Sequence, residues 1–177
     1  MQSKKFIVLA FLLLSACLGA FAQPANDNCS GAIVVLPDST CYNGTTVNAG
    51  DSWIGTVGCQ TNGTHPDVWY SFVATGSILS VNLAAGTMTG NVEFVLVNAT
   101  GNCTGFGYAG SLCGPSPLSG NITGLQIGSI YYFTISSSGN TGTFRVCVKN
   151  SNPPTLAGQD CSTAAVLCNG KIGRAHV

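Results

Sequence analysis

Apolar and polar residues alternate along most of the chain with a period of two. Leu79, Val81 and Leu83 fall on one side of a run whose other side carries Ser80 and Asn82. This spacing is typical of strands with one buried face. The same alternation, or a richer apolar run, predicts about nine short strands, at residues 32–36, 44–48, 52–57, 67–74, 77–83, 92–97, 121–125, 129–136 and 144–149.

Turn-forming glycine, asparagine, serine and proline residues separate these runs, and no segment shows sustained helical spacing with caps. The pattern therefore predicts an all-β fold, a two-sheet antiparallel β-sandwich packed on its apolar faces. We favour a jelly-roll-like strand order, although periodicity does not separate it from an immunoglobulin-like order. The glycine-rich stretch 104–112 is predicted to be a hairpin loop.

Residues 1–22 have the anatomy of an export signal. A charged start precedes an apolar run, residues 6–14, that is too short to span a bilayer, and Ala20-Phe21-Ala22 is a cleavage site. Leu14-Ser15-Ala16-Cys17 resembles a lipobox, so lipidation at Cys17 is the alternative to cleavage after Ala22. Both predictions place the protein outside the inner membrane, secreted or on the outer cell surface. No later run is long enough to be a transmembrane segment.

The C-terminal region divides into short pieces. Residues 172–177 match a translated sequencing adapter, so we expect an artefact there. Cys161-Ser162-Thr163-Ala164 repeats the pattern of Cys29-Ser30-Gly31-Ala32, which predicts that residues 159–171 begin a second, truncated module. The proline-rich stretch 151–158 is then a linker, and residues 24–150 form one complete β-sandwich module.

Charge is scarce in this chain. Charged residues make up 7% of it, against about 25% in an ordinary globular protein. Residues 23–170 contain Arg145 and Lys149 against six acidic residues, a net charge of −4. This composition lacks the basic field that binding to nucleic acid requires, so no nucleic acid partner is expected.

Eight cysteines follow the signal segment, and an even number in an exported chain indicates disulfides. There is no C-x-x-C pair, and His65 is the only histidine before the tail, which argues against a metal or redox site. Six of the cysteines belong to the first module. We expect three pairs, which are Cys103 with Cys113, Cys41 with Cys59, and Cys29 with Cys147.

Three stretches together carry a family resemblance, residues 24–29 (PANDNC), 66–72 (PDVWYSF) and 128–135 (GSIYYFTI). They resemble the NDNC-type β-sandwich repeats of secreted, multidomain bacterial surface proteins, commonly type IX secretion cargo. Those modules are similar to pre-peptidase C-terminal and carbohydrate-binding jelly rolls. The resemblance implies no shared catalytic residue, so none is assigned here.

Candidate catalytic chemistry is weak. His65, Asp67 and Ser71 are the nearest set for a serine hydrolase, but no Gly-x-Ser-x-Gly elbow is present and Asp67 suits the turn before a strand. Glu93 is expected to stand alone on an outward strand face, without the second carboxylate that a glycosidase needs. We therefore expect no enzyme.

Two binding sites are considered. Asp51 and Asp67, together with carbonyl oxygens, suit a structural calcium site, although both residues also fit solvated turns. Calcium is the only cofactor that we consider. Trp53 is the aromatic residue best placed to stack on a sugar.

We expect a non-catalytic extracellular module of a longer exported cell-surface protein, serving adhesion, display or spacing. The alternative is a carbohydrate-binding module attached to an extracellular hydrolase or protease, with glycans or cell-surface polymers as partners.

Overall fold

The computed structural model describes residues 22–52, 64–99 and 103–152. The predicted second module and the adapter-like tail lie outside the described residues, as do Trp53, Cys59 and all but the last residue of the predicted signal segment. Nine strands and one short 3-10 helix make up the described part.

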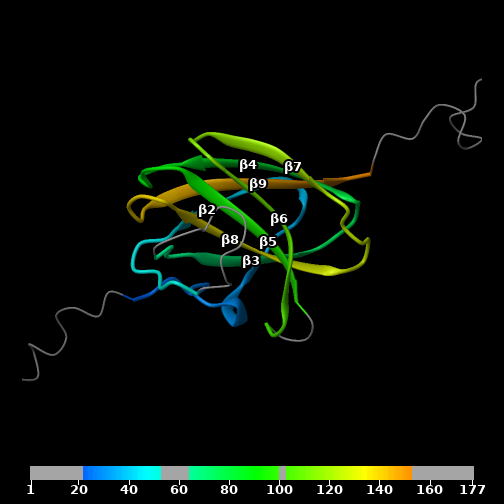
Figure 1. The fold of residues 1–177 in the computed structure, drawn as a ribbon, viewed down its shortest axis with the longest axis horizontal. Coiled ribbons are helices and arrows are strands. Elements are labelled where there is room, and N and C mark those ends of the chain that lie inside the picture. Colours follow the sequence, from blue (N-terminus) through cyan, green and yellow to red (C-terminus); the bar gives the residue numbers. More distant parts are fainter. Residues whose placement is uncertain (1–21, 53–63, 100–102, 153–177) are drawn as a thin grey trace, which may run out of the picture.

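The chain alternates between strands and short connections in the order shown in Figure 1. The elements are η1 (Cys29–Gly31), β1 (Ile33–Val34), β2 (Asp38–Thr45), β3 (Val68–Val73), β4 (Ile78–Ala85), β5 (Val92–Ala99), β6 (Phe106–Gly114), β7 (Leu118–Thr123), β8 (Ile130–Ser137) and β9 (Thr143–Ser151).

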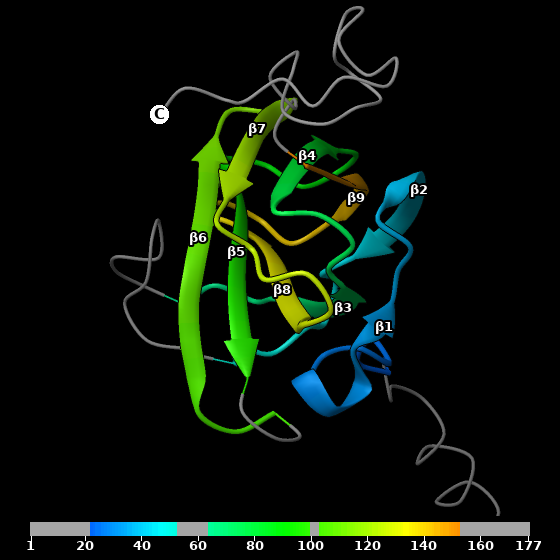
Figure 2. The same cartoon turned by 90° about the vertical axis from the view of Figure 1, so that its right-hand side faces the viewer.

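Two sheets lie face to face, as Figures 1 and 2 show. Sheet A has the order β1-β3-β8-β5-β6, and sheet B has the order β2-β9-β4-β7. Every pairing is antiparallel except the short parallel pairing of β1 with β3. Counted from β2, the eight longer strands follow the order 1-8-3-6 in sheet B and 2-7-4-5 in sheet A, which is the jelly-roll arrangement. The all-β sandwich is therefore confirmed, in the jelly-roll order that we favoured.

The main core lies between the two sheets and is rich in aromatic rings. Phe133 of β8 is at its centre, with ring centroids 4.7 Å from Phe94 and 5.1 Å from Tyr70. Sheet B supplies alternating apolar residues from β4 and β9, and their period-two patterns were predicted correctly. Stacked rings of this kind contribute roughly 0.5–1.5 kcal/mol per pair beyond the area that they bury.

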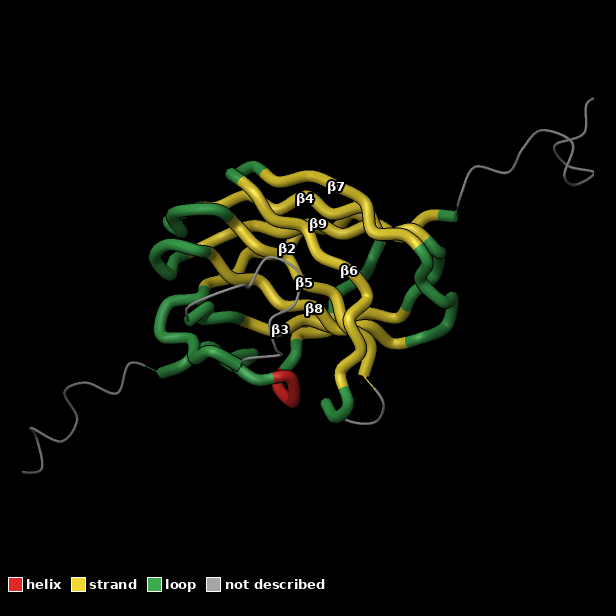
Figure 3. Tube along the Cα trace, in the orientation of Figure 1, coloured by secondary structure: helices red, strands yellow, loops and turns green. Residues whose placement is uncertain are grey.

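Sheet A is buried on both faces, which the sequence pattern did not predict. All six residues from Val92 to Val97 in β5 are buried. The face turned away from sheet B holds a second apolar cluster that includes Cys29, Trp69 and Val95. The N-terminal segment forms this outer layer, and η1, red in Figure 3, lies beyond sheet A on the side opposite sheet B. Sheet A is thus the middle layer of three.

Two strands differ from prediction. The predicted glycine-rich loop is strand β6, which pairs with β5 along its whole length. The strand was not predicted because it consists largely of small residues. A register shift beside Gly110, whose φ is +152°, also breaks the alternation of apolar and polar positions. Strand β2 begins at Asp38, six residues before the predicted strand 44–48, because pairing with β9 starts directly after Pro37.

The disulfides join different cysteines from those expected. Cys29 of η1 is bonded to Cys103, and Cys41 of β2 is bonded to Cys147 of β9. All three expected pairings, Cys103 with Cys113, Cys41 with Cys59 and Cys29 with Cys147, are therefore wrong. Each observed bond links residues that are far apart in sequence, separated by 74 and 106 positions. Spacing along the chain gave no sign of them, because strand order brings these pairs together.

Cys113 is also disulfide-bonded, and because the other four described cysteines pair with one another, its partner lies outside the described residues. The expectation that the sandwich is disulfide-braced is confirmed. Disulfides of this kind persist in oxidising compartments.

The observed pairing predicts the result of non-reducing peptide mapping. Pepsin digestion of the oxidised protein should yield one linked peptide pair containing Cys29 and Cys103 and another containing Cys41 and Cys147. The strand order dictates both, because it places the sulfur atoms within bonding distance. A peptide pair joining Cys103 to Cys113 would contradict the strand arrangement described here.

Candidate functional site

A buried polar network lies on the outer face of sheet A. Glu93 of β5 is 3% exposed, and its Oε2 atom lies 2.8 Å from Nδ1 of His65. The Ser136 hydroxyl of β8 donates to the same oxygen at 2.7 Å. Glu93 was expected on an outward face and does point away from sheet B, but the N-terminal layer and the segment before β3 bury it. The network compensates the cost of burying the carboxylate.

Three carboxylates lie close together beside this network. Asp27 accepts a hydrogen bond from the backbone N–H of Gly50, and Asp67 accepts one from that of Ser52 at 3.3 Å. Asp51 accepts a bond from the backbone of His65 at 3.2 Å. The acids thus hold the two ends of a chain segment against sheet A.

Trp69 of β3 ties the same segment to the sheet. Its indole N–H donates to the Ser52 hydroxyl at 2.9 Å, and that hydroxyl donates to the Asp27 carbonyl at 3.0 Å. The side-chain amide of Asn26 donates to the Trp69 carbonyl at 3.0 Å, while the Trp69 N–H donates to the Asn26 carbonyl at 2.8 Å. The Asn-Asp pair in the N-terminal motif therefore has a structural explanation, because both residues dock the outer layer onto β3.

Burial raises the pKa of Asp67 to about 7 from its ordinary value of 3.8. Hydrogen bonds from Ser52 oppose this shift, and the nearby charges of Asp51 and Asp27 add to it. Asp67 therefore carries a proton in a large fraction of molecules at neutral pH. In its protonated form Asp67 holds the backbone of Ser52 through a hydrogen bond without carrying a charge.

The residues considered for catalysis are not arranged as a serine hydrolase requires. In such a site an imidazole lies between the nucleophile and the acid, whereas here the Glu93 carboxylate lies between His65 and Ser136. The hydroxyl proton of Ser136 points to the carboxylate. Asp67 holds the Ser52 backbone. Among the described residues, these hydrogen bonds join β5 to β8 and to the segment before β3.

The predicted binding residues have separate outcomes. In the described ranges no three or more histidine, cysteine or acidic side chains are grouped so as to hold a metal ion. Asp51 and Asp67 each accept a backbone hydrogen bond, and the two carboxylates fall short of the six to eight oxygens that calcium takes. Calcium binding there stays a prediction. Trp53 lies outside the described residues, and its role as a sugar platform also stays a prediction.

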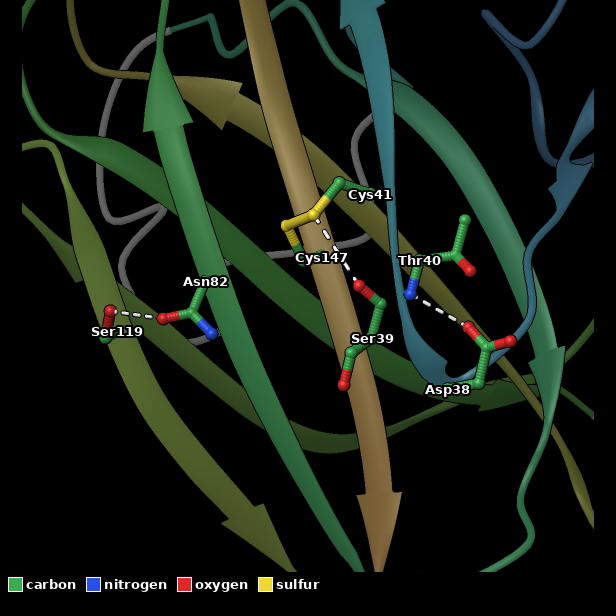
Figure 4. Close-up of a disulfide and its surroundings, with 7 residues drawn as sticks. All are labelled: Asp38, Ser39, Thr40, Cys41, Asn82, Ser119 and Cys147. Atoms are coloured by element: carbon green, nitrogen blue, oxygen red, sulfur yellow. Dashed lines mark hydrogen bonds between the residues drawn. A yellow bond between two sulfur atoms is a disulfide. The ribbon is translucent and has the colours of Figure 1, made fainter.

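The outer face of sheet B has a different character. The Cys41–Cys147 disulfide joins the edge strand β2 to β9, as Figure 4 shows, and Asn82 and Ser119 of the next two strands are hydrogen-bonded to each other at 2.6 Å. Sequence reasoning missed this face, because its residues come from four strands that are not consecutive.

The two ends of the described chain lie at opposite ends of the sandwich. In Figure 1 the blue N-terminal segment enters at one end of the long axis, and the orange end of β9 leaves at the other. No helix in the described residues is long and apolar enough to cross a membrane.

Comparison with known proteins finds likenesses to solved structures. No family model matches the chain, and no curated protein matches it. The chain is similar to a solved structure described as "1.0 Angstrom Crystal Structure of pre-Peptidase C-terminal Domain of Collagenase from Bacillus anthracis", at 16% identity and a TM-score of 0.43. The match covers 67% of this chain and 94% of that chain. The NDNC-type repeat and the type IX secretion route stay predictions.

The raised pKa of Asp67 predicts a pH-dependent contribution to stability. Because its folded pKa is about 7, above the value near 4 in the unfolded chain, the folded state retains this proton while the unfolded state loses it. The contribution of Asp67 is therefore complete below pH 4 and is lost as the pH rises to about 7. The variant Asp67→Asn keeps an oxygen that accepts the hydrogen bond from Ser52 but carries no charge. It should therefore remove the pH-dependent loss in the free energy of unfolding, which amounts to up to about 4 kcal/mol.

Urea unfolding of the wild type and Asp67→Asn at pH 4 and pH 7.5 measures this effect. The variant should gain stability relative to the wild type as the pH rises, and Asp38→Asn, at a fully exposed acid, is the matched control. An equal difference between wild type and Asp67→Asn at both pH values would show that Asp67 is not buried as described.

Calcium has its own test. If Asp51 and Asp67 hold calcium, millimolar calcium chloride should raise the melting temperature of the wild type by several degrees over a sample in EDTA, since a ligand bound only to the folded state stabilises it. The variant Asp67→Asn should show a smaller rise. Equal melting temperatures of the wild type with and without calcium would refute the site.

Proposed function

We propose that this chain is a load-bearing spacer, a non-catalytic extracellular β-sandwich module of a longer exported surface protein. One observation carries the proposal. The Cys41–Cys147 disulfide joins the first and last long strands, through which the chain enters and leaves the sandwich. Tension applied to the two ends of the chain therefore runs along a short covalent path.

That path can be followed along the chain. From Ala22 it runs to Cys41, crosses the disulfide to Cys147 and continues to Asn152. Residues 42–146 form a closed covalent ring beside the path and bear no end-to-end tension while the bond holds. The jelly-roll core lies almost entirely in this ring.

The disulfide greatly shortens the distance that the stretched chain can span between its two ends. A fully extended chain spans about 3.5 Å per residue, so the path through the disulfide reaches roughly 85 Å. Without any disulfide, residues 22–152 would reach roughly 455 Å. The bond thus limits the module to a small part of the extension that its length allows, which suits a spacer that must keep its size under load.

The proposal is consistent with the other features of the chain. The disulfides suit an oxidising, extracellular setting, and the ends of the described chain lie at opposite ends of the module. A spacer must be held at both ends, which the lipidation at Cys17 provides at the N-terminal end and cleavage after Ala22 does not. The partial repeat after the linker is the expectation that places the other end within a longer exported protein. Adhesion or display by that protein is part of the proposal.

Single-molecule stretching of residues 22–152 between terminal tags tests the proposal. The variant Cys41→Ser/Cys147→Ser should extend about 110 Å further than the oxidised wild type, because the shortest path then runs through Cys29–Cys103. Cys29→Ser/Cys103→Ser is the matched control. It also lacks one disulfide, but that bond lies outside the shortest path, so its maximum extension should equal that of the wild type.

An oxidised wild type that releases as much length as Cys41→Ser/Cys147→Ser would overturn the proposal. A control variant that lengthens while Cys41–Cys147 is intact would do the same, because the load would then follow another path.

A further inference from the structure

The outer face of sheet B carries a hollow lined by residues from three neighbouring strands. Its volume is about 290 Å³, and its lining includes Asn43 of β2, Ala84 of β4 and Arg145 of β9. These three residues lie in one row across the sheet, because Arg145 is the register partner of Asn43 on one side and of Ala84 on the other. Thr143 lies beside them on β9.

Arg145 is a free cation in this hollow. It is exposed, and it makes no salt bridge within the described part of the chain. The small side chain of Ala84, its register partner on β4, leaves its guanidinium group room for a ligand. A guanidinium group presents a planar fork of donors that matches a carboxylate in two parallel hydrogen bonds.

Acidic residues are unevenly distributed over the sandwich. Of the described acids, only Asp38 belongs to a strand of sheet B, where it is the register partner of Lys149 and lies outside the row of Arg145. The carboxylates of Asp27, Asp67 and Glu93 lie in the outer layer on sheet A. The only basic residues in the described ranges are Arg145 and Lys149, both exposed on β9. An anion approaching sheet B therefore meets attraction at Arg145 without a competing acid beside it in the row.

The surroundings of the hollow favour a sugar over a peptide. The large exposed apolar side chains of the described residues lie elsewhere, none of them in β2, β4, β7 or β9. Three polar side chains, Asn43, Thr143 and Arg145, line the hollow together with Gly44, Ala84, Ala85, Gly86 and Phe144. Asn82 and Ser119 add further polar groups to the same sheet, outside the hollow. Such groups donate to and accept from sugar hydroxyls, whereas a bound peptide would need apolar contacts for its side chains.

We propose that this hollow binds a carboxylate-bearing sugar of an acidic polysaccharide, with Arg145 pairing with the carboxylate and Asn43 and Thr143 contacting the neighbouring hydroxyls. The site is independent of the load path, because none of these residues belongs to the shortest covalent path. It would let the spacer adhere to an acidic extracellular polymer along its side.

Binding of the mature, oxidised full chain to polygalacturonate tests the proposal, with fully methyl-esterified polygalacturonate as the matched neutral polymer. The acid form should bind and the ester should bind at least tenfold more weakly. Arg145→Met, which keeps the aliphatic stem, should weaken binding to the acid form at least tenfold. Lys149→Met removes the same charge four positions along β9, about 13 Å away, and should weaken it less than threefold.

A second variant tests the hollow itself. Ala84→Leu fills it without removing a charge and should also weaken binding at least tenfold. Thermal melting of each variant checks the fold, which should be retained because these side chains are exposed or half-buried.

Three results would overturn the proposal. The first is equal binding of the acid and ester polymers, or of neither. The second is equal loss in Arg145→Met and Lys149→Met, which would indicate nonspecific attraction. The third is polyglutamate binding as tightly as polygalacturonate, which would show that any polymer with carboxylates is accepted.

Discussion

The pairing of β2 with β9 is the contact on which the rest of the structure depends. These strands are the first and last long strands of the jelly roll, and they lie side by side in sheet B. Their contact closes the sandwich, and the Cys41–Cys147 bond makes the closure covalent. In the chain-entropy model a loop of this length stabilises the fold by about 4.7 kcal/mol. The same closure decides where tension runs.

A second constraint follows from the composition. The outer face of sheet A is apolar at Trp69, Val95 and Val97. The chain has few charged residues, and a broad apolar face of this kind is not stable in contact with water. The N-terminal segment covers that face. It is held by Cys29–Cys103, by the hydrogen bond that Asn26 donates to Trp69 and by the one that Asp27 accepts from Gly50. The acids in and beside the NDNC motif therefore hold the N-terminal segment on sheet A. The outer face of sheet B is not covered in this way and carries the proposed binding site.

Local pattern predicted much of this fold, and contacts distant in sequence account for the rest. Strands such as β4 and β9 bury one face, so their period of two was visible. Strand β5 is buried on both faces and β6 is built of small residues, so alternation described neither strand correctly. The disulfides, the partners of Glu93 and the row containing Arg145 each join segments that are far apart in the chain. Spacing in the sequence carries no signal for such neighbours.

The central claim is that end-to-end tension passes through Cys41–Cys147. Both cysteines are half-buried, so a small thiol can reach the bond. The most direct measurement holds the oxidised module at constant force and adds dithiothreitol. The account predicts a first extension step of about 110 Å, at a rate that rises with force because the loaded bond is the one attacked. A first step of another length, or a rate of reduction that does not change with force, would contradict it.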